Sequence, residues 1–242
     1  MRRVVRAFWG PRPESAEALA GRWKRTLDGI TALLPEAVAP GGATGAGTWR
    51  QVHGTGPETE LPADEGALLG ALRVAQAAED WSDLTGTALR LHRTDAPGLR
   101  TEVSGLAGGA PQFLLQSFVV TLHAPDGADV PEAELLAVLA REWEPDFGDA
   151  SDDDVLDALE DDAGYSVGDP VVGRVGYLSP ARAALVPDDL EAVREELSGG
   201  GVLLRIADAG AHASAEVVAA YERLRDGGAL DPLPRPMDRA VL

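Results

Sequence analysis

The sequence predicts an α+β protein, with an antiparallel meander that carries helices on one side and a strand-helix-strand-helix segment towards the C-terminus. Three observations favour this class. Short apolar runs are punctuated by Gly and Pro, several longer stretches show apolar residues at helical spacing, and 45% of the 242 residues are hydrophobic, which is enough for a buried core.

The first half of the chain supplies the meander. A strand is expected over residues 3–9, followed by a helix from residue 13 to residue 34, where a proline suits the first turn. A Gly- and Pro-rich stretch over residues 40–47 breaks the pattern. The remaining elements are a short strand, a helix and three strands separated by turn residues, expected over residues 48–53, 62–78, 88–93, 99–104 and 113–123.

The character of the chain changes after Pro125-Asp126-Gly127. Four helices are expected over residues 131–143, 151–159, 187–197 and 214–225, and two strands over residues 170–178 and 201–206. The strand-helix-strand order leaves one parallel crossover open. We expect a single domain over residues 1–242, or two subdomains over residues 1–126 and 127–242.

Acidic residues dominate the charge: 40 Asp and Glu stand against 21 Lys and Arg, giving a formal net charge of −19. Such a surface repels phosphate backbones and anionic lipid, so nucleic acid and membranes are poor partners, whereas a basic protein is a good one. The alternative is that the acidity only confers solubility.

The absence of cysteine excludes disulfides, thiolate metal sites and cysteine nucleophiles. The basic start, Met1-Arg2-Arg3, leads into an apolar stretch too short for a signal sequence, and no run approaches the roughly 20 apolar residues of a membrane span. We therefore expect a cytoplasmic protein.

The most unusual feature is an acidic stretch over residues 142–162 that contains no Lys or Arg. It lacks the ligand spacing of an EF-hand, and it is compatible with a solvated helix whose first-turn aspartates cap its N-terminus. The alternative is an electrostatic docking surface in which two aromatic residues act as anchors. The predicted partner-binding residues are Glu142, Trp143, Glu144, Asp146, Phe147, Asp149, Asp152, Asp153, Asp154 and Asp157.

Catalytic and cofactor motifs are weak. Gly164-Tyr165-Ser166-Val167-Gly168 matches the G-x-S-x-G pattern of serine hydrolases, and His212 lies downstream, but the order here is helix to strand instead of strand to helix. The four histidines lack metal-ligand spacing, and the glycines over residues 42–47 do not fit a dinucleotide fingerprint. We therefore expect no catalytic residue, no metal and no cofactor.

Three segments resemble the bacterial immunity protein 52 family: residues 6–15 (RAFWGPRPES), 175–179 (VGYLS) and 199–206 (GGGVLLRI). The resemblance is strong only towards the ends of the chain. It implies an α+β, non-enzymatic protein encoded beside a polymorphic toxin, often one with a restriction-endonuclease fold. The family supplies no catalytic residues to transfer.

The resemblance and the charge agree. A nuclease that binds phosphates has a basic cleft, which attracts an acidic protein. The sequence therefore predicts an immunity protein that binds and neutralises a cognate toxin, a basic nuclease, through its acidic surface. A serine hydrolase using Ser166 and His212, or an acidic protein-interaction module of another purpose, are the alternatives.

Overall fold

The computed structural model describes residues 1–34, 47–96, 98–208, 210 and 212–242. Most of the Gly- and Pro-rich stretch at residues 40–47 lies outside them. The strands are β1 (Arg2–Trp9), β2 (Arg50–Gln51), β3 (Thr59–Glu60), β4 (Thr87–Ala96), β5 (Leu99–Ala107), β6 (Gln116–His123), β7 (Phe147–Ser151), β8 (Val175–Leu178), β9 (Val193–Glu196) and β10 (Val202–Arg205). The helices are α1 (Ala16–Leu33), α2 (Glu65–Gln76), α3 (Glu132–Trp143), α4 (Asp153–Ala163), α5 (Pro180–Ala183) and α6 (Ala213–Asp226).

The strands form one sheet in the order β3-β2-β4-β5-β6-β1-β7-β8-β10-β9. Every strand pair among the described residues is antiparallel, so the parallel crossover left open by the sequence does not occur. β1 pairs with β6 on one side and with β7 on the other. The sheet therefore joins strands from residues 1–126 and 127–242, the two segments that the sequence offers as subdomains.

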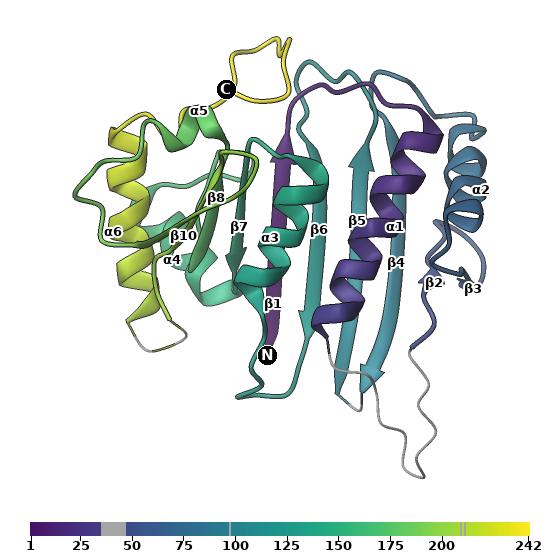
Figure 1. The fold of residues 1–242 in the computed structure, drawn as a ribbon, viewed down its shortest axis with the longest axis horizontal. Coiled ribbons are helices and arrows are strands. Elements are labelled where there is room, and N and C mark those ends of the chain that lie inside the picture. The colour runs from purple at the N-terminus through teal and green to yellow at the C-terminus, as the bar shows by residue number, and fades with distance from the viewer. Residues whose placement is uncertain (35–46, 97, 209, 211) are drawn as a thin grey trace.

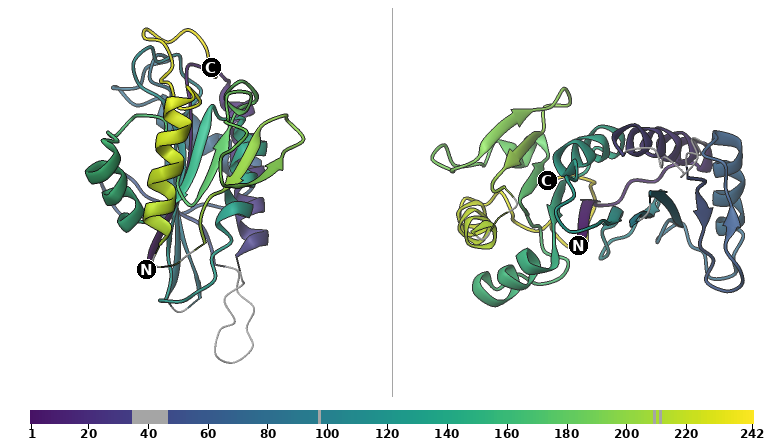
Figure 2. Two further views of the ribbon diagram at one scale, coloured as in Figure 1. Left: turned by 90° about the vertical axis from the view of Figure 1, so that its left-hand side faces the viewer. Right: turned by 90° about the horizontal axis from the view of Figure 1, so that it is seen from below.

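Helices cover one face along most of the sheet and the other face only at its β7–β10 end (Figure 1, Figure 2). α1 and α2 lie over the meander and α3 continues the same layer over β1, β7 and β8, around a core that includes Trp9, Trp23 and Phe118. α4 and α6 pack against each other and against the other face of β7, β8 and β10, in a second core that includes Leu159 and Tyr221. This arrangement confirms the predicted α+β class and the meander with helices on one side.

The second face of β4, β5 and β6 has no helix over it among the described elements (Figure 2). It carries the half-buried residues that alternate with the core positions, such as Ser104, Val119 and Thr121. Arg6 lies opposite Val119 in the β1–β6 register, and directly opposed residues share a face. This uncovered face is therefore continuous with the side of β1 that bears Arg6 and Phe8.

The helix predicted over residues 187–197 is wrong, because part of this segment is strand β9. Leu190, Val193 and Leu197 fall at helical spacing, but β9 and β10 form a hairpin closed by Gly200, whose φ of +82° glycine adopts readily. Pairing with the buried strand β10 overrides the local pattern.

The sequence also gives no sign of β7. Gly148, Asp149 and Ser151 are poor strand formers, yet all five residues of β7 are buried between β1 and β8. Part of the acidic stretch is thus an inner strand of the sheet and not a surface segment.

Candidate functional site

The acidic stretch divides into two parts with different surroundings. From Glu142 to Asp153 every carboxylate forms an ion pair with at least one arginine, and three of these arginines come from β1. The pairs are Glu142 with Arg25 and Arg141, Glu144 with Arg22, Asp146 with Arg182, Asp149 with Arg6, Asp152 with Arg3 and Arg174, and Asp153 with Arg2.

Asp146 is part of the interior. Its side chain and that of Arg182 are both fully buried, and Arg182 Nη2 donates to Asp146 Oδ2 at 2.6 Å. Asp146 Oδ1 accepts hydrogen bonds from Ser179 Oγ at 3.2 Å and from the backbone N–H of Leu242 at 2.9 Å. This carboxylate therefore holds the C-terminal segment against the sheet.

Asp149 lies directly opposite Arg6 in the β1–β7 pairing. Arg6 Nε and Nη2 donate to the two carboxylate oxygens at 3.0 and 2.9 Å, and Ser151 Oγ donates to Asp149 at 2.7 Å. Burial alone would lower the pKa of Arg6, but the charge and hydrogen bonds of Asp149 outweigh it and raise the pKa. A buried, fully bonded carboxylate of this kind belongs to the sheet and cannot meet a partner.

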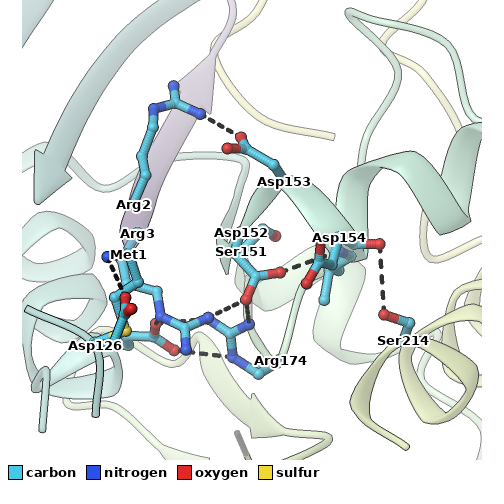
Figure 3. A network of polar contacts seen from close by, with 12 residues as sticks. Met1, Arg2, Arg3, Asp126, Ser151, Asp152, Asp153, Asp154, Arg174 and Ser214 are labelled. Carbon is cyan, nitrogen blue, oxygen red and sulfur yellow. Dashed lines mark hydrogen bonds and ion pairs between the residues drawn. The ribbon is translucent and has the colours of Figure 1, made fainter. Parts of the chain in front are cut away.

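Asp152 joins β1, α3 and α4 (Figure 3). Its Oδ1 accepts the N–H of Val155 at 3.0 Å and so caps α4, and its Oδ2 accepts from Arg174 Nη1 at 2.6 Å and from Arg3. Arg174 also donates to Glu132 at 2.6 Å. Burial would raise the pKa of Asp152, but the Val155 N–H and the two arginines outweigh burial and lower it.

The two predicted aromatic anchors are buried in this structure. Trp143 is 0% exposed, stacks between Trp9 and Phe118, and donates its Nε1–H to Thr26 Oγ1 at 2.9 Å. Phe147 is 1% exposed and stacks on Phe8 with ring centroids 5.2 Å apart. The prediction that they anchor a partner is corrected here: large apolar side chains at the end of α3 and on an inner strand fill the two cores.

The second part of the acidic stretch is the exposed face of α4. Val155, Leu159 and Ala163, spaced by four residues, turn into the core. The remaining positions of α4 carry acidic side chains that are exposed and form no ion pair within the described chain: Asp154, Asp157, Glu160, Asp161 and Asp162. Of the ten predicted partner-binding residues, Glu144, Asp153, Asp154 and Asp157 are exposed, and only Asp154 and Asp157 of these lack a cation partner.

Two loops at one end of the meander carry exposed apolar residues. Trp81 and Leu84, before β4, and Phe113 and Leu114, before β6, are 37%, 61%, 64% and 54% exposed. The two loops are joined by a hydrogen bond of 3.0 Å from the N–H of Ala110 to the backbone oxygen preceding Leu84. The sequence predicts Phe113 and Leu114 within a strand over residues 113–123, but β6 begins at Gln116 and leaves both residues in the loop before it. Only the fold brings this loop beside the loop before β4.

The structure keeps Ser166 and His212 apart. α4 and α6 run side by side in the same direction: Ser214 Oγ bonds a carbonyl in the first turn of α4 at 3.4 Å, and Arg225 bonds the carbonyl of its last residue at 2.8 Å. His212 directly precedes α6 and Ser166 follows α4. An 11-residue helix such as α4 is roughly 16 Å long, so these side chains do not form a catalytic pair in this structure.

Two of the histidines each contact one polar side chain near β3. His92 Nε2 lies 2.7 Å from Glu58 Oε2, and His53 Nε2 lies 2.8 Å from Thr59 Oγ1. The described residues contain no group of three or more His, Asp or Glu side chains that could hold a metal ion.

A scan against protein-family models finds no match for this sequence, and a search of curated proteins finds none either. Within the described residues, no helix combines the length and the apolar character needed to cross a membrane.

Proposed function

We propose that this chain is a bacterial immunity protein that binds a cognate toxin, a nuclease with a basic cleft, and blocks its activity. The observation that carries the proposal is the exposed face of α4, where Asp154, Asp157, Glu160, Asp161 and Asp162 have no cation partner among the described residues. The resemblance of residues 6–15, 175–179 and 199–206 to the bacterial immunity protein 52 family points the same way.

Unpaired carboxylates on one helical face suit a docking role for a physical reason. They raise the negative potential of the surface and add little to the stability of the fold, whereas ion-paired carboxylates are already compensated. A basic cleft gains favourable electrostatic energy from this face, and such complementarity can raise association rates to about 10⁸–10⁹ M⁻¹s⁻¹ at low salt. Fast capture is what a cell needs when its own genome is the target of the toxin.

The surroundings of α4 can widen the contact. α4 lies on the same side of the sheet as the uncovered face of β4, β5 and β6 (Figure 2). That face contains a hollow of about 470 Å³, lined by residues that include Arg90, Ser104 and Leu106.

Co-purification tests the function. The chain is expressed with the product of the gene immediately upstream of its own, and growth is measured with that product alone and with both proteins. A tight complex and rescued growth are the expected results. A complex without toxicity would make the chain an acidic interaction module instead. The absence of both a complex and toxicity would overturn the proposal.

A further inference from the structure

β9 leaves one edge of the ten-stranded sheet open, and its four residues, Val193 to Glu196, are all exposed. The hairpin turn fixes which backbone groups are used. Leu197 N–H donates to Gly201 O at 2.8 Å, and hydrogen-bonded and non-hydrogen-bonded pairs alternate along an antiparallel ladder. Glu195 and Val193 therefore use their backbone groups to pair with β10, and the positions between them do not. The N–H and C=O groups of Arg194 and Glu196 therefore point away from β10, and no described residue bonds to them.

We propose that a second copy of this chain pairs with β9 in the antiparallel direction, which makes the protein a two-fold dimer through this edge. The proposal does not depend on the immunity function. The outward N–H and C=O groups lie two residues apart, at Arg194 and Glu196. Two copies of β9 exchange hydrogen bonds through these groups when Arg194 of each copy faces Glu196 of the other, and this sets the register. The two-fold axis then passes through Glu195.

The side chains of β9 fit this register. Arg194 and Glu196 lie on one face of the strand. On each side of the two-fold axis, Arg194 of one copy meets Glu196 of the other, so opposite charges face each other. On the other face, Val193, which is 68% exposed, meets the half-buried Leu197 of the second copy. An isologous interface needs a patch that complements itself. Four of the five positions from Val193 to Leu197 meet a complementary residue in this register.

The fifth position, Glu195, faces its own copy. Arg205 Nη2 lies 3.9 Å from Glu195 Oε2 in each chain, so a positive charge stands beside each carboxylate. The short edge and the net charge of −19 predict weak association that depends on concentration.

A single cysteine tests the register, because the wild-type chain contains none. In Glu195→Cys the two introduced residues are a non-hydrogen-bonded pair on the axis, with Cα atoms about 4.5 Å apart, which suits a disulfide. We expect rapid formation of a covalent dimer under mild oxidation at about 100 μM protein. Glu196→Cys, one residue along, and Glu222→Cys on the exposed side of α6 are the controls and should cross-link at least about tenfold more slowly.

Charge exchange tests the pairing without a covalent bond. Sedimentation equilibrium of the full chain should show an average mass that rises from 25.3 kDa towards twice that value with concentration. Arg194→Glu and Glu196→Arg should each weaken the dimer about tenfold or more, and the double variant should restore it because the opposite charges face each other again. Arg73→Glu, an equal charge change on α2, should have little effect.

Three results would overturn the dimer: a constant monomer mass over the concentration range, cross-linking of Glu195→Cys no faster than that of Glu222→Cys, or a double variant as weak as the single ones. Arg194 also donates to the carbonyl of Pro187, so Arg194→Glu alone can disturb the loop before β9. Glu196→Arg and the cysteine variant do not touch that bond, and they keep the test decisive.

Discussion

Residues 142–153 and residues 154–162 are equally acidic in sequence and opposite in role. In the first segment the carboxylates face arginines of β1, α1, α3, α5 and the loop before β8, and Asp146 and Asp149 are fully buried. In the second segment five carboxylates project from α4 without a cation partner among the described residues. The first segment holds the sheet together, and the second is available to a partner.

The difference arises from the register of β1 against β7. The basic start of the chain places Arg6 opposite Asp149, and Arg2 and Arg3 at the start of α4. Beyond Asp153 no arginine of β1 remains to pair with the acidic residues. A run of like charges in a sequence therefore marks a surface only where the fold brings no opposite strand beside it.

The largest expected effect is on Asp146. Asp146→Ala should lower the free energy of unfolding by about 3–5 kcal/mol, because it leaves Arg182 buried without its partner. Urea unfolding at pH 7 measures the change. A loss as small as that of an exposed residue would show that the first segment does not stabilise the fold.

An intermediate effect is expected at Asp152. Asp152→Asn keeps a side chain that caps α4 but removes the charge beside Arg174, and it should cost roughly 1–3 kcal/mol at pH 7. Because the folded-state pKa of Asp152 is lowered, its contribution is present above the unfolded pKa of about 3.9 and is lost as the pH falls through the folded pKa. The wild type should therefore lose more stability than the variant between pH 5 and about pH 2.5, and equal losses in urea titrations would contradict this assignment.

The smallest effect is expected on α4. Asp157→Asn, Glu160→Gln and Asp161→Asn should each change the free energy of unfolding by no more than about 0.5 kcal/mol, because these exposed side chains have no partner to lose. Thermal or urea unfolding of the triple variant, beside Asp146→Ala, completes the comparison. A large destabilisation would mean that these carboxylates have a structural role.

Much of the fold follows from patterns within single segments. Residues 3–9, 62–78, 131–143 and 214–225 show clear periodicity, and each forms the expected strand or helix with shifts of a few residues. The failures are segments whose structure depends on a distant partner. β9 is a strand because its backbone pairs with β10. β7 accommodates the buried Asp149 because Arg6 neutralises its charge.

The candidate site is only partly predictable for the same reason. Asp152 as the cap of α4 follows from local spacing, and so does the exposure of Asp157. The burial of Trp143 depends on the packing of α3 onto α1 and β6, and the contact between the loops before β4 and β6 joins segments that are distant in sequence. The arginines of β1 appear in the sequence only as a basic N-terminus, and their pairing with the acidic stretch requires the β1–β7 register.

Charge reversal of Asp152, Asp153 and Asp154, which the sequence alone would suggest, removes the cap of α4 and three ion pairs, so it tests stability instead of docking. A better triple variant is Asp157→Lys, Glu160→Lys and Asp161→Lys. Its control changes the charge equally at the other end of the sheet (Figure 1), with exposed residues on α1, β3 and α2: Asp28→Lys, Glu60→Lys and Glu65→Lys.

The most direct test of the central claim is the association rate of each triple variant with the product of the upstream gene, measured at low and at high salt. The account predicts that the α4 variant binds at least about tenfold more slowly at low salt, that the difference shrinks as salt rises, and that the control variant stays near the wild type. Equal rates for the two variants at both salt concentrations would contradict it.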